Sequence, residues 1–270
     1  NSNTLARLAD SYYASAYRGE MGSEAFNKAL RRWINEQTGG LLKDSADGLS
    51  LAPDTVIALA STIYFRAKWG SEFSKSATAD GVFHAPDGDV THKFMHETME
   101  STYYAADNFA AVGKYLEGSG TMWFLLPDEG VTVEELWQQE NFLGEELAVP
   151  THVVRVNWSV PKFDLHDSLK LNDALQALGV TDAFDENKAD FAPLTEQPAY
   201  VKSVNQAARV KIDEEGVEAA AYTEVDTNAG DAPPQEMPEE EMNLNRPFLF
   251  VIWKDGAPLF VGAVQTMEGM

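Results

Sequence analysis

The chain has 270 residues, 44% of them hydrophobic, which is enough to bury the core of one large domain or two small ones. Its 43 acidic and 20 basic side chains give a net charge of −23, which repels nucleic acid and anionic membrane surfaces. Cysteine is absent, which excludes disulfides and thiolate chemistry. No apolar run approaches the roughly 20 residues that cross a bilayer. From the charge and the lack of such a run, we expect no nucleic-acid or membrane partner.

The first half of the chain predicts two helices followed by short strands. Apolar residues have the spacing of an amphipathic helix in the segments 5–12 and 23–38. Residues 55–65 are nearly all apolar and rich in β-branched side chains, which predicts a strand covered on both faces. Between 83 and 126, short strand-like runs alternate with turns containing Pro, Asp, Gly or Ser. These runs predict the hairpins of antiparallel sheets.

The second half predicts further strands and helices in irregular order. A short helix over 132–138 begins with a threonine cap, and a strand follows over 153–163. Leucines at helical spacing predict a helix over 168–178, and the alternating segment 200–212 predicts a long strand. Because strands and helices follow one another without a repeating βαβ unit, we expect the α+β class.

A segment near residue 216 has the pattern of a strand without a partner. Small or apolar residues alternate with Glu218, Tyr222 and Glu224 from Val217 onward. The run is rich in alanine, so neither helix nor strand propensity fixes its conformation. The acidic stretch 226–242 follows, with one glycine and three prolines, and we expect it to be exposed and mobile. A segment that can be either loop or strand indicates a conformational switch.

The sequence contains no motif typical of an enzyme. We find no Gly-x-Ser-x-Gly elbow, His-Glu-x-x-His pair, phosphate-binding loop or dinucleotide-binding glycine set. His84, His92 and His96 are three of the five histidines and lie near one another in the sequence, where they could hold a metal or be ordinary surface residues. The tripeptide 157–159 is a formal glycosylation acceptor but lies within a predicted strand. We therefore expect no enzymatic activity, no metal and no cofactor.

The segment 242–252 reads Met-Asn-Leu-Asn-Arg-Pro-Phe-Leu-Phe-Val-Ile and resembles the C-terminal signature of the serpin family position by position. The segments 55–69, 124–130 and 160–163 extend the resemblance over essentially the whole chain. It implies a prokaryotic-type member with mostly antiparallel sheets, a large central sheet, packed helices and an exposed reactive-centre loop at about 216–241.

The resemblance also implies how the chain is organised. We expect a single serpin-like domain over 1–270. The first match falls near the family's fifth helix, so we expect the family's N-terminal portion to be missing from this chain. An extracellular or periplasmic location is slightly favoured by the resemblance.

An inhibitor of serine-type endopeptidases is the function that the resemblance implies. The target protease cleaves the loop and forms a covalent acyl complex, and it is trapped when the severed hinge enters the central sheet as a new strand. Gly216 supplies the free φ about which the segment turns, and small side chains can enter a packed interior. The hinge comprises Glu215, Gly216, Val217, Glu218, Ala219, Ala220 and Ala221.

Two further clusters follow from the same resemblance. Lys162 and Glu214 match the charge pair of the breach, where insertion begins. Trp69 lies beside them in the family, although simple core filling would explain it equally well. Ser61 and Gln206 match the shutter, where serpins usually carry asparagine and histidine, and both can still hydrogen-bond.

The reactive bond has two candidate positions. Counting forward from the hinge places it between Gly230 and Asp231, and the nearby Ala229 is a possible site for a protease that prefers small residues. Counting backward from Pro247 places it between Glu236 and Met237, which would suit a glutamate-specific protease. We favour the first position because insertion constrains the hinge side of the loop.

Two other interpretations stay open. The chain could be a non-inhibitory binding or chaperone-like protein with the serpin fold, whose loop is cut without trapping a protease. It could also be an inactive fragment whose central sheet is left uncovered. The glycine and small residues of the hinge favour the inhibitor.

Overall fold

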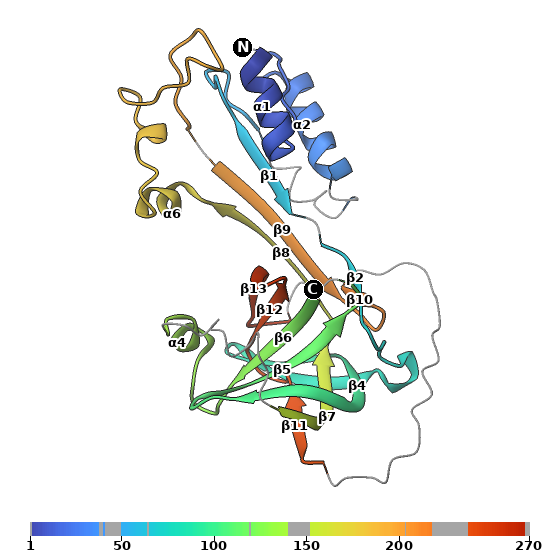
Figure 1. Ribbon diagram of the computed structural model, residues 1–270. Helices are drawn as coiled ribbons and strands as arrows, with labels where there is room; N and C mark the ends of the chain where they lie inside the picture. The colour runs from blue at the N-terminus through green and yellow to red at the C-terminus, as the bar shows by residue number, and fades with distance from the viewer. Residues whose placement is uncertain are drawn as a thin grey trace. The chain divides into compact units, whose positions relative to one another are not determined.

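The computed structural model describes residues 2–37, 40, 50–63, 65–118, 120–139, 152–202, 204–217 and 237–267 (Figure 1). Its helices are α1 (Ser2–Tyr12), α2 (Glu24–Gln37), α4 (Val133–Trp137) and α6 (Asn172–Ala177), and η1 (Lys75–Ala77) and η2 (Asp182–Phe184) are short 3-10 helices. No helix within the described ranges is long and apolar enough to span a membrane.

The strands of the described residues form two sheets, which confirms the predicted α+β class. The five-stranded sheet contains β1 (Leu59–Ile63), β9 (Val204–Ile212), β10 (Gly216–Val217) and β2 (Ala67–Lys68) in that order, and β8 (Phe163–Lys170) also pairs with β9. The eight-stranded sheet contains β11 (Glu239–Asn243), β7 (His152–Pro161), β4 (Gly88–Ala105), β5 (Phe109–Leu116), β6 (Gly120–Pro127), β12 (Phe248–Lys254) and β13 (Ala257–Val264), and β3 (Ala79–Ala85) pairs with β4.

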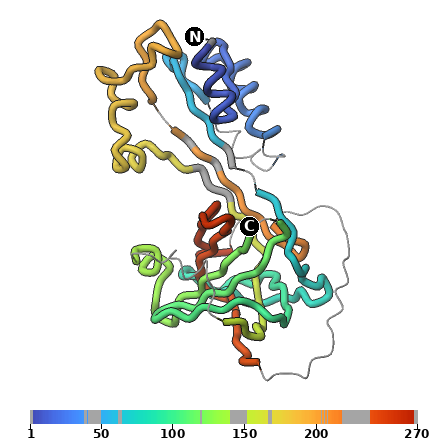
Figure 2. The backbone as a smooth tube through the Cα atoms, in the orientation of Figure 1, coloured from blue at the N-terminus to red at the C-terminus, as the bar shows by residue number. Residues whose placement is uncertain are grey.

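Tight turns build the eight-stranded sheet from hairpins, as the sequence predicts. The pairs β3–β4, β5–β6 and β12–β13 are all antiparallel. The prediction of short runs between 83 and 126 is wrong for residues 88–105, which form the single 18-residue strand β4 that pairs with β3, β5 and β7. Strand β12, near the C-terminus, pairs with β6 from the middle of the chain, and Figure 2 colours both by residue number. Contacts distant in sequence therefore hold this sheet together.

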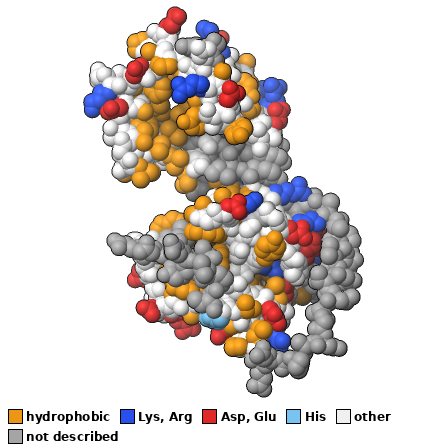
Figure 3. Space-filling view, viewed as in Figure 1, with side chains coloured by type: hydrophobic (Ala, Val, Ile, Leu, Met, Phe, Trp, Pro, Cys, Tyr) orange, Lys and Arg blue, Asp and Glu red, His pale blue; other side chains and the backbone are white. Residues whose placement is uncertain are grey.

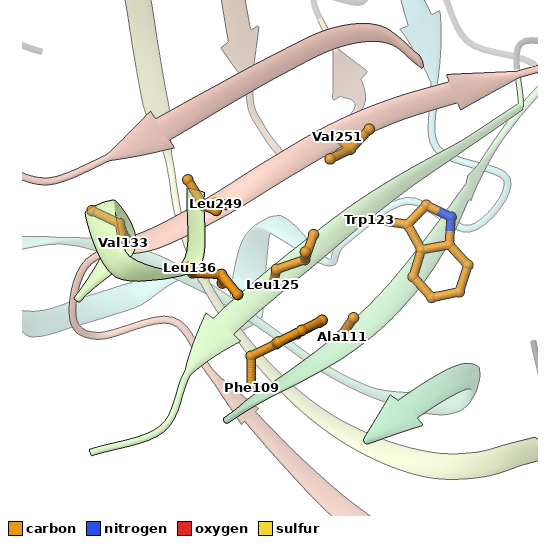
Figure 4. Packing of buried hydrophobic residues seen from close by; sticks show 8 residues of the cluster. All are labelled: Phe109, Ala111, Trp123, Leu125, Val133, Leu136, Leu249 and Val251. Carbon is orange, nitrogen blue, oxygen red and sulfur yellow. The ribbon is translucent and has the colours of Figure 1, made fainter. Parts of the chain in front are cut away.

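One core cluster of this sheet lies beneath α4 (Figure 4). Two residues come from each of β5, β6, α4 and β12: Phe109, Ala111, Trp123, Leu125, Val133, Leu136, Leu249 and Val251. The predicted helix start is confirmed, because Thr132 accepts from the backbone N–H of Glu135 while the Glu135 carboxylate accepts from the backbone N–H of Thr132. This capping box lets a helix of only five residues keep its apolar side on the sheet.

Contacts divide the chain into two compact units, Asn1–Tyr64 with His166–Arg209, and Phe65–Leu165 with Val210–Met270. In the first unit, Ile34 and Asn27 of α2 are buried, and the Asn27 side chain accepts from the backbone N–H of Leu51. Hydrophobic side chains are exposed on the unit that carries α1 and α2 (Figure 3). Val56 is 38% exposed and Leu59 is 51% exposed.

These exposures correct the prediction for residues 55–65. Only Leu59–Ile63 form a strand, and its residues 59–61 are exposed. The strand is therefore not covered on both faces. The strand pairs with β9 over residues 204–208 alone, and turns and bends occupy the residues before it. The predicted strand over 200–212 is also shorter than expected, since β9 begins at Val204.

The helix predicted over 168–178 is confirmed for Asn172–Ala177 but begins later than expected. Strand β8 continues to Lys170, and α6 covers only Asn172–Ala177. Pairing of β8 with β9 supplies a backbone ladder that overrides the helical spacing of the leucines. The acidic stretch 226–242 needs a similar correction at its end, because Glu239–Asn243 pair with β7 and Met242 is fully buried.

Candidate functional site: the hinge and its anchors

The candidate site is the turn between β9 and β10, where the predicted hinge begins. The backbone N–H of Asp213 donates to Gly216 O at 3.0 Å, and its carboxylate accepts from the N–H of Glu215 at 2.9 Å. Val217 then pairs with Ile212 of β9 and with Ala67 of β2. Only 1% of Val217 is exposed. Gly216 and Val217 of the predicted hinge are therefore already part of a sheet.

Glu214 anchors this turn through its carboxylate. Lys162 Nζ lies 2.8 Å from Glu214 Oε2, and Thr78 Oγ1 donates to Glu214 Oε1 at 2.8 Å. The Glu214 side chain is 10% exposed and that of Lys162 is 36% exposed. Lys162 and Glu214, which the sequence analysis paired, are therefore in contact. The Thr78 hydroxyl binds the second oxygen of the Glu214 carboxylate.

The electrostatics of the turn favour ionised carboxylates. Burial by itself raises the pKa of Glu214, but hydrogen bonds from Lys162, a backbone N–H and Thr78 outweigh it, so this pKa lies below its ordinary value. The neighbouring Glu215 accepts a hydrogen bond from Lys75, which lowers the pKa of Glu215 and raises that of Lys75. Both carboxylates are charged at neutral pH, so the turn carries two ion pairs.

Two aromatic residues hold the backbone of the same turn. The Trp69 indole N–H donates to Asp213 O at 2.8 Å, and its backbone N–H donates to Glu215 O at 3.1 Å. The backbone N–H of Phe73 donates to Glu214 O at 2.9 Å. Trp69 is 1% exposed, so it fills the core and also binds the hinge turn.

A close backbone approach requires glycine at position 216. A Cβ atom there would lie 2.3 Å from Ala67 O and 2.7 Å from Lys68 Cα, and φ is +156°. No side chain fits against that backbone without displacing β2. In this structure Gly216 therefore allows β10 to approach β2.

The two predicted shutter residues are neighbours across β1 and β9. Ser61 and Gln206 are register partners in this parallel pair. The Ser61 side chain is exposed, and that of Gln206 is half-buried. The other β1–β9 pairs extend from Leu59 opposite Val204 to Ile63 opposite Ala208.

Comparisons with known proteins place this geometry in a family. The profile described as Serpin (serine protease inhibitor) matches residues 5–267. The chain belongs to the serpin family. It is 32% identical over 243 residues to an uncharacterized serpin-like protein of Thermococcus kodakarensis, covering 88% of this chain and 56% of that protein. It is also 32% identical over 252 residues to Serpin-ZXA of Oryza sativa subsp. japonica, covering 87% and 62%.

A solved serpin has the same fold. The native state of the thermophilic serpin tengpin superposes with a TM-score of 0.82 at 26% identity, covering 96% of this chain and 67% of that chain. This serpin therefore spans only 56–67% of the length of the relatives named here. The expectation of a prokaryotic-type serpin agrees with the archaeal and thermophilic relatives.

Part of the predicted serpin hinge and both reactive-bond candidates fall largely outside the described residues. These are Glu218, Ala219, Ala220, Ala221, Gly230, Asp231 and Glu236. Met237 is described and half-buried, two residues before β11. Both candidate bonds remain predictions from the sequence.

The described side chains of His84 and His92 bind different groups. His84 Nδ1 lies 2.7 Å from Asp89 Oδ1, and His92 Nε2 lies 2.7 Å from the backbone oxygen of Lys162. Within the described part of the chain, no group of three His, Asp or Glu side chains is arranged to hold a metal ion.

Sequence analysis missed several residues that hold the serpin hinge. Thr78 and Lys75 lie more than 130 residues from the glutamates they bind, and no local pattern marks them. Lys114 also escaped notice, although it carried a signal. It occupies an inward position of the apolar strand β5, between Val112 and Leu116, where a charged residue is unexpected.

Proposed function

We propose that this serpin inhibits serine-type endopeptidases as a single-use suicide substrate and has no catalytic activity of its own. The protease serine attacks a loop carbonyl, an ester bond to the enzyme forms, and the peptide C–N bond breaks as its nitrogen takes up a proton. The hinge then enters the central sheet and carries the acyl-enzyme with it. The partner is a serine protease, and no cofactor is required.

The observation that best supports this proposal is the state of the hinge before cleavage. Gly216 and Val217 already form β10, paired with both β2 and β9. A strand that has begun can lengthen residue by residue once its far end is free. The residues that follow are small at alternate positions, so the sequence suits continued entry into a packed sheet.

Insertion of the hinge would break some backbone pairs of the sheet and form others. The parallel pairs between β1 and β9, including Ser61 with Gln206, would have to separate to admit a strand between them. The new strand would then pair on both edges, which satisfies more backbone groups than the original contact. About fourteen residues at roughly 3.3 Å each give a strand on the order of 45 Å long, which would move the cleaved end far from its start.

Electrophoresis after incubation with proteases tests the function. The protein is mixed with elastase-like, trypsin-like, subtilisin-like and glutamate-specific enzymes. An inhibitor gives a band of summed mass that resists SDS, and loop cleavage raises its thermal midpoint. Mass spectrometry of the released peptide distinguishes cleavage between Gly230 and Asp231 from cleavage between Glu236 and Met237.

A matched pair of variants separates insertion from cleavage. The alternation predicts that Val217 faces the sheet interior and that Glu218 faces solvent. Ala219→Arg, at the next inward position of the same alternation, is expected to be cut without forming the complex, whereas Glu218→Arg is expected to retain it. Clean cleavage of the unmodified protein by every protease, with no complex and no gain in heat resistance, would refute inhibition and favour the non-inhibitory alternative.

A further inference from the structure

A buried ion pair lies directly behind the hinge anchors. The Lys114 side chain in β5 is 1% exposed, and its Nζ lies 3.2 and 3.1 Å from Glu97 Oε1 and Oε2 in β4. Nζ also lies 3.4 Å from Met99 Sδ. The Glu97 side chain is 13% exposed. One carboxylate therefore neutralises a cation that is almost fully removed from water.

The remaining sides of this cation are covered by the two aromatic rings of the site. Lys114 Nζ lies 4.2 Å from the centroid of the Phe73 ring and 5.6 Å from that of the Trp69 ring. The two rings meet edge to face, with centroids 6.0 Å apart and planes at 87°. A cation at these distances attracts the ring faces, most strongly where water is excluded. Lys114 thus constrains the orientation of both rings.

Burial disfavours the charged forms of both Lys114 and Glu97. Burial lowers the pKa of Lys114 and raises that of Glu97, while the attraction between the two groups opposes each shift. A buried charge is tolerated when its partner is well placed, and removing one partner leaves the other uncompensated. The positions of Lys114 and Glu97 are therefore tightly coupled.

The same two rings belong to the residues that hold the hinge turn. Trp69 donates to the backbone oxygens of Asp213 and Glu215, and Phe73 donates to that of Glu214. Trp69 also forms an isolated antiparallel bridge with Leu116 of β5. A continuous set of contacts therefore leads from the ion pair through the rings to the backbone at 213–215.

We propose that Lys114 and Glu97 are positioning residues of the hinge, which hold Trp69 and Phe73 against residues 213–215 and so set how readily the hinge turn opens. The consequence for loop insertion rests on the proposed function. The control of local opening does not, because it depends only on contacts within the folded chain.

Hydrogen exchange measured by mass spectrometry tests the proposal without any protease. The variant Lys114→Met with Glu97→Gln removes the cation and leaves no buried charge unpaired. The amides of Trp69 and Phe73 are expected to exchange about tenfold faster, while those of β12 and β13 keep their rates. Val133→Ala, in the separate cluster under α4, is the matched control that removes core contacts without touching the rings.

The outcomes are distinct. Faster exchange at 69–73 in the double variant but not in Val133→Ala supports the proposal, and unchanged exchange at 69–73 overturns it. If the double variant does not fold, Lys114→Met alone carries the test, because it removes the cation and leaves only Glu97, whose partly exposed carboxylate can take up a proton. In an inhibitory protein, the double variant should also convert faster to a heat-resistant uncleaved form. If the unmodified protein forms no protease complex, inhibition is refuted. The positioning role of Lys114 and Glu97 is then still tested by the hydrogen-exchange rates at residues 69–73.

Discussion

Replacing Glu214 by lysine should release the hinge turn and destabilise the protein. The carboxylate accepts from Lys162 Nζ and Thr78 Oγ1, both at 2.8 Å. Loss of these two bonds, one of them charged, costs about 2–3 kcal/mol. A second ammonium group beside the partly exposed Lys162 adds roughly 1 kcal/mol of repulsion, since Lys162 can turn toward water. A total of about 3–4 kcal/mol corresponds to a fall of about 6–16 °C in the thermal midpoint.

Thermal melts and native gels measure the two expected effects. The melts give the loss of stability, and a ladder of species on native gels would show that the released hinge of one molecule pairs with the sheet of another. Glu214→Gln is the matched control, because an amide keeps the shape of the side chain and can still accept from Thr78. It should cost about 1 kcal/mol and give no ladder.

A double-mutant cycle isolates the Glu214–Lys162 pair. Glu214→Gln, Lys162→Met and the combined variant should show a coupling of about 1 kcal/mol, typical of side chains in direct contact. A coupling below about 0.3 kcal/mol, together with a Glu214→Lys midpoint equal to that of the unmodified protein, would show that the pair does not hold the hinge.

Three further predictions concern the backbone, the pH dependence and the helix cap. Gly216→Ala should lower the free energy of unfolding by about 2 kcal/mol or more in urea titrations, because the new Cβ meets the β2 backbone; an unchanged midpoint would contradict the close approach. The pKa of Glu214 is lowered in the folded protein, so its stabilisation is fully present above the ordinary pKa of 4.5 and is lost as the pH falls through the folded pKa. The free energy of unfolding should therefore fall more steeply with acid in the unmodified protein than in Glu214→Gln. Parallel curves of stability against pH would contradict this role of Glu214. Thr132→Ala should cost about 1 kcal/mol and Thr132→Ser much less, and equal losses would refute the capping role.

Local patterns were sufficient where neighbouring residues decide the structure. The cap at Thr132 and the turns of the hairpins involve residues within a few positions of one another, so the sequence predicts them. The helical leucine spacing after residue 168 misplaced the start of the helix, because β9 pairs with the backbone of β8 as far as Lys170. Local propensity amounts to a few tenths of a kcal/mol per residue, and a ladder of hydrogen bonds outweighs it.

The sequence by itself determined the family, the irregular order of strands and helices, and the small alternating residues after Gly216. It also named Lys162 and Glu214, but only through resemblance to other serpins. The tertiary structure decided that Thr78 shares the Glu214 carboxylate and that Lys114 lies behind the Trp69 ring. These contacts join residues far apart along the chain, and their energies depend on distance and exclusion of water, which no local pattern of side chains encodes.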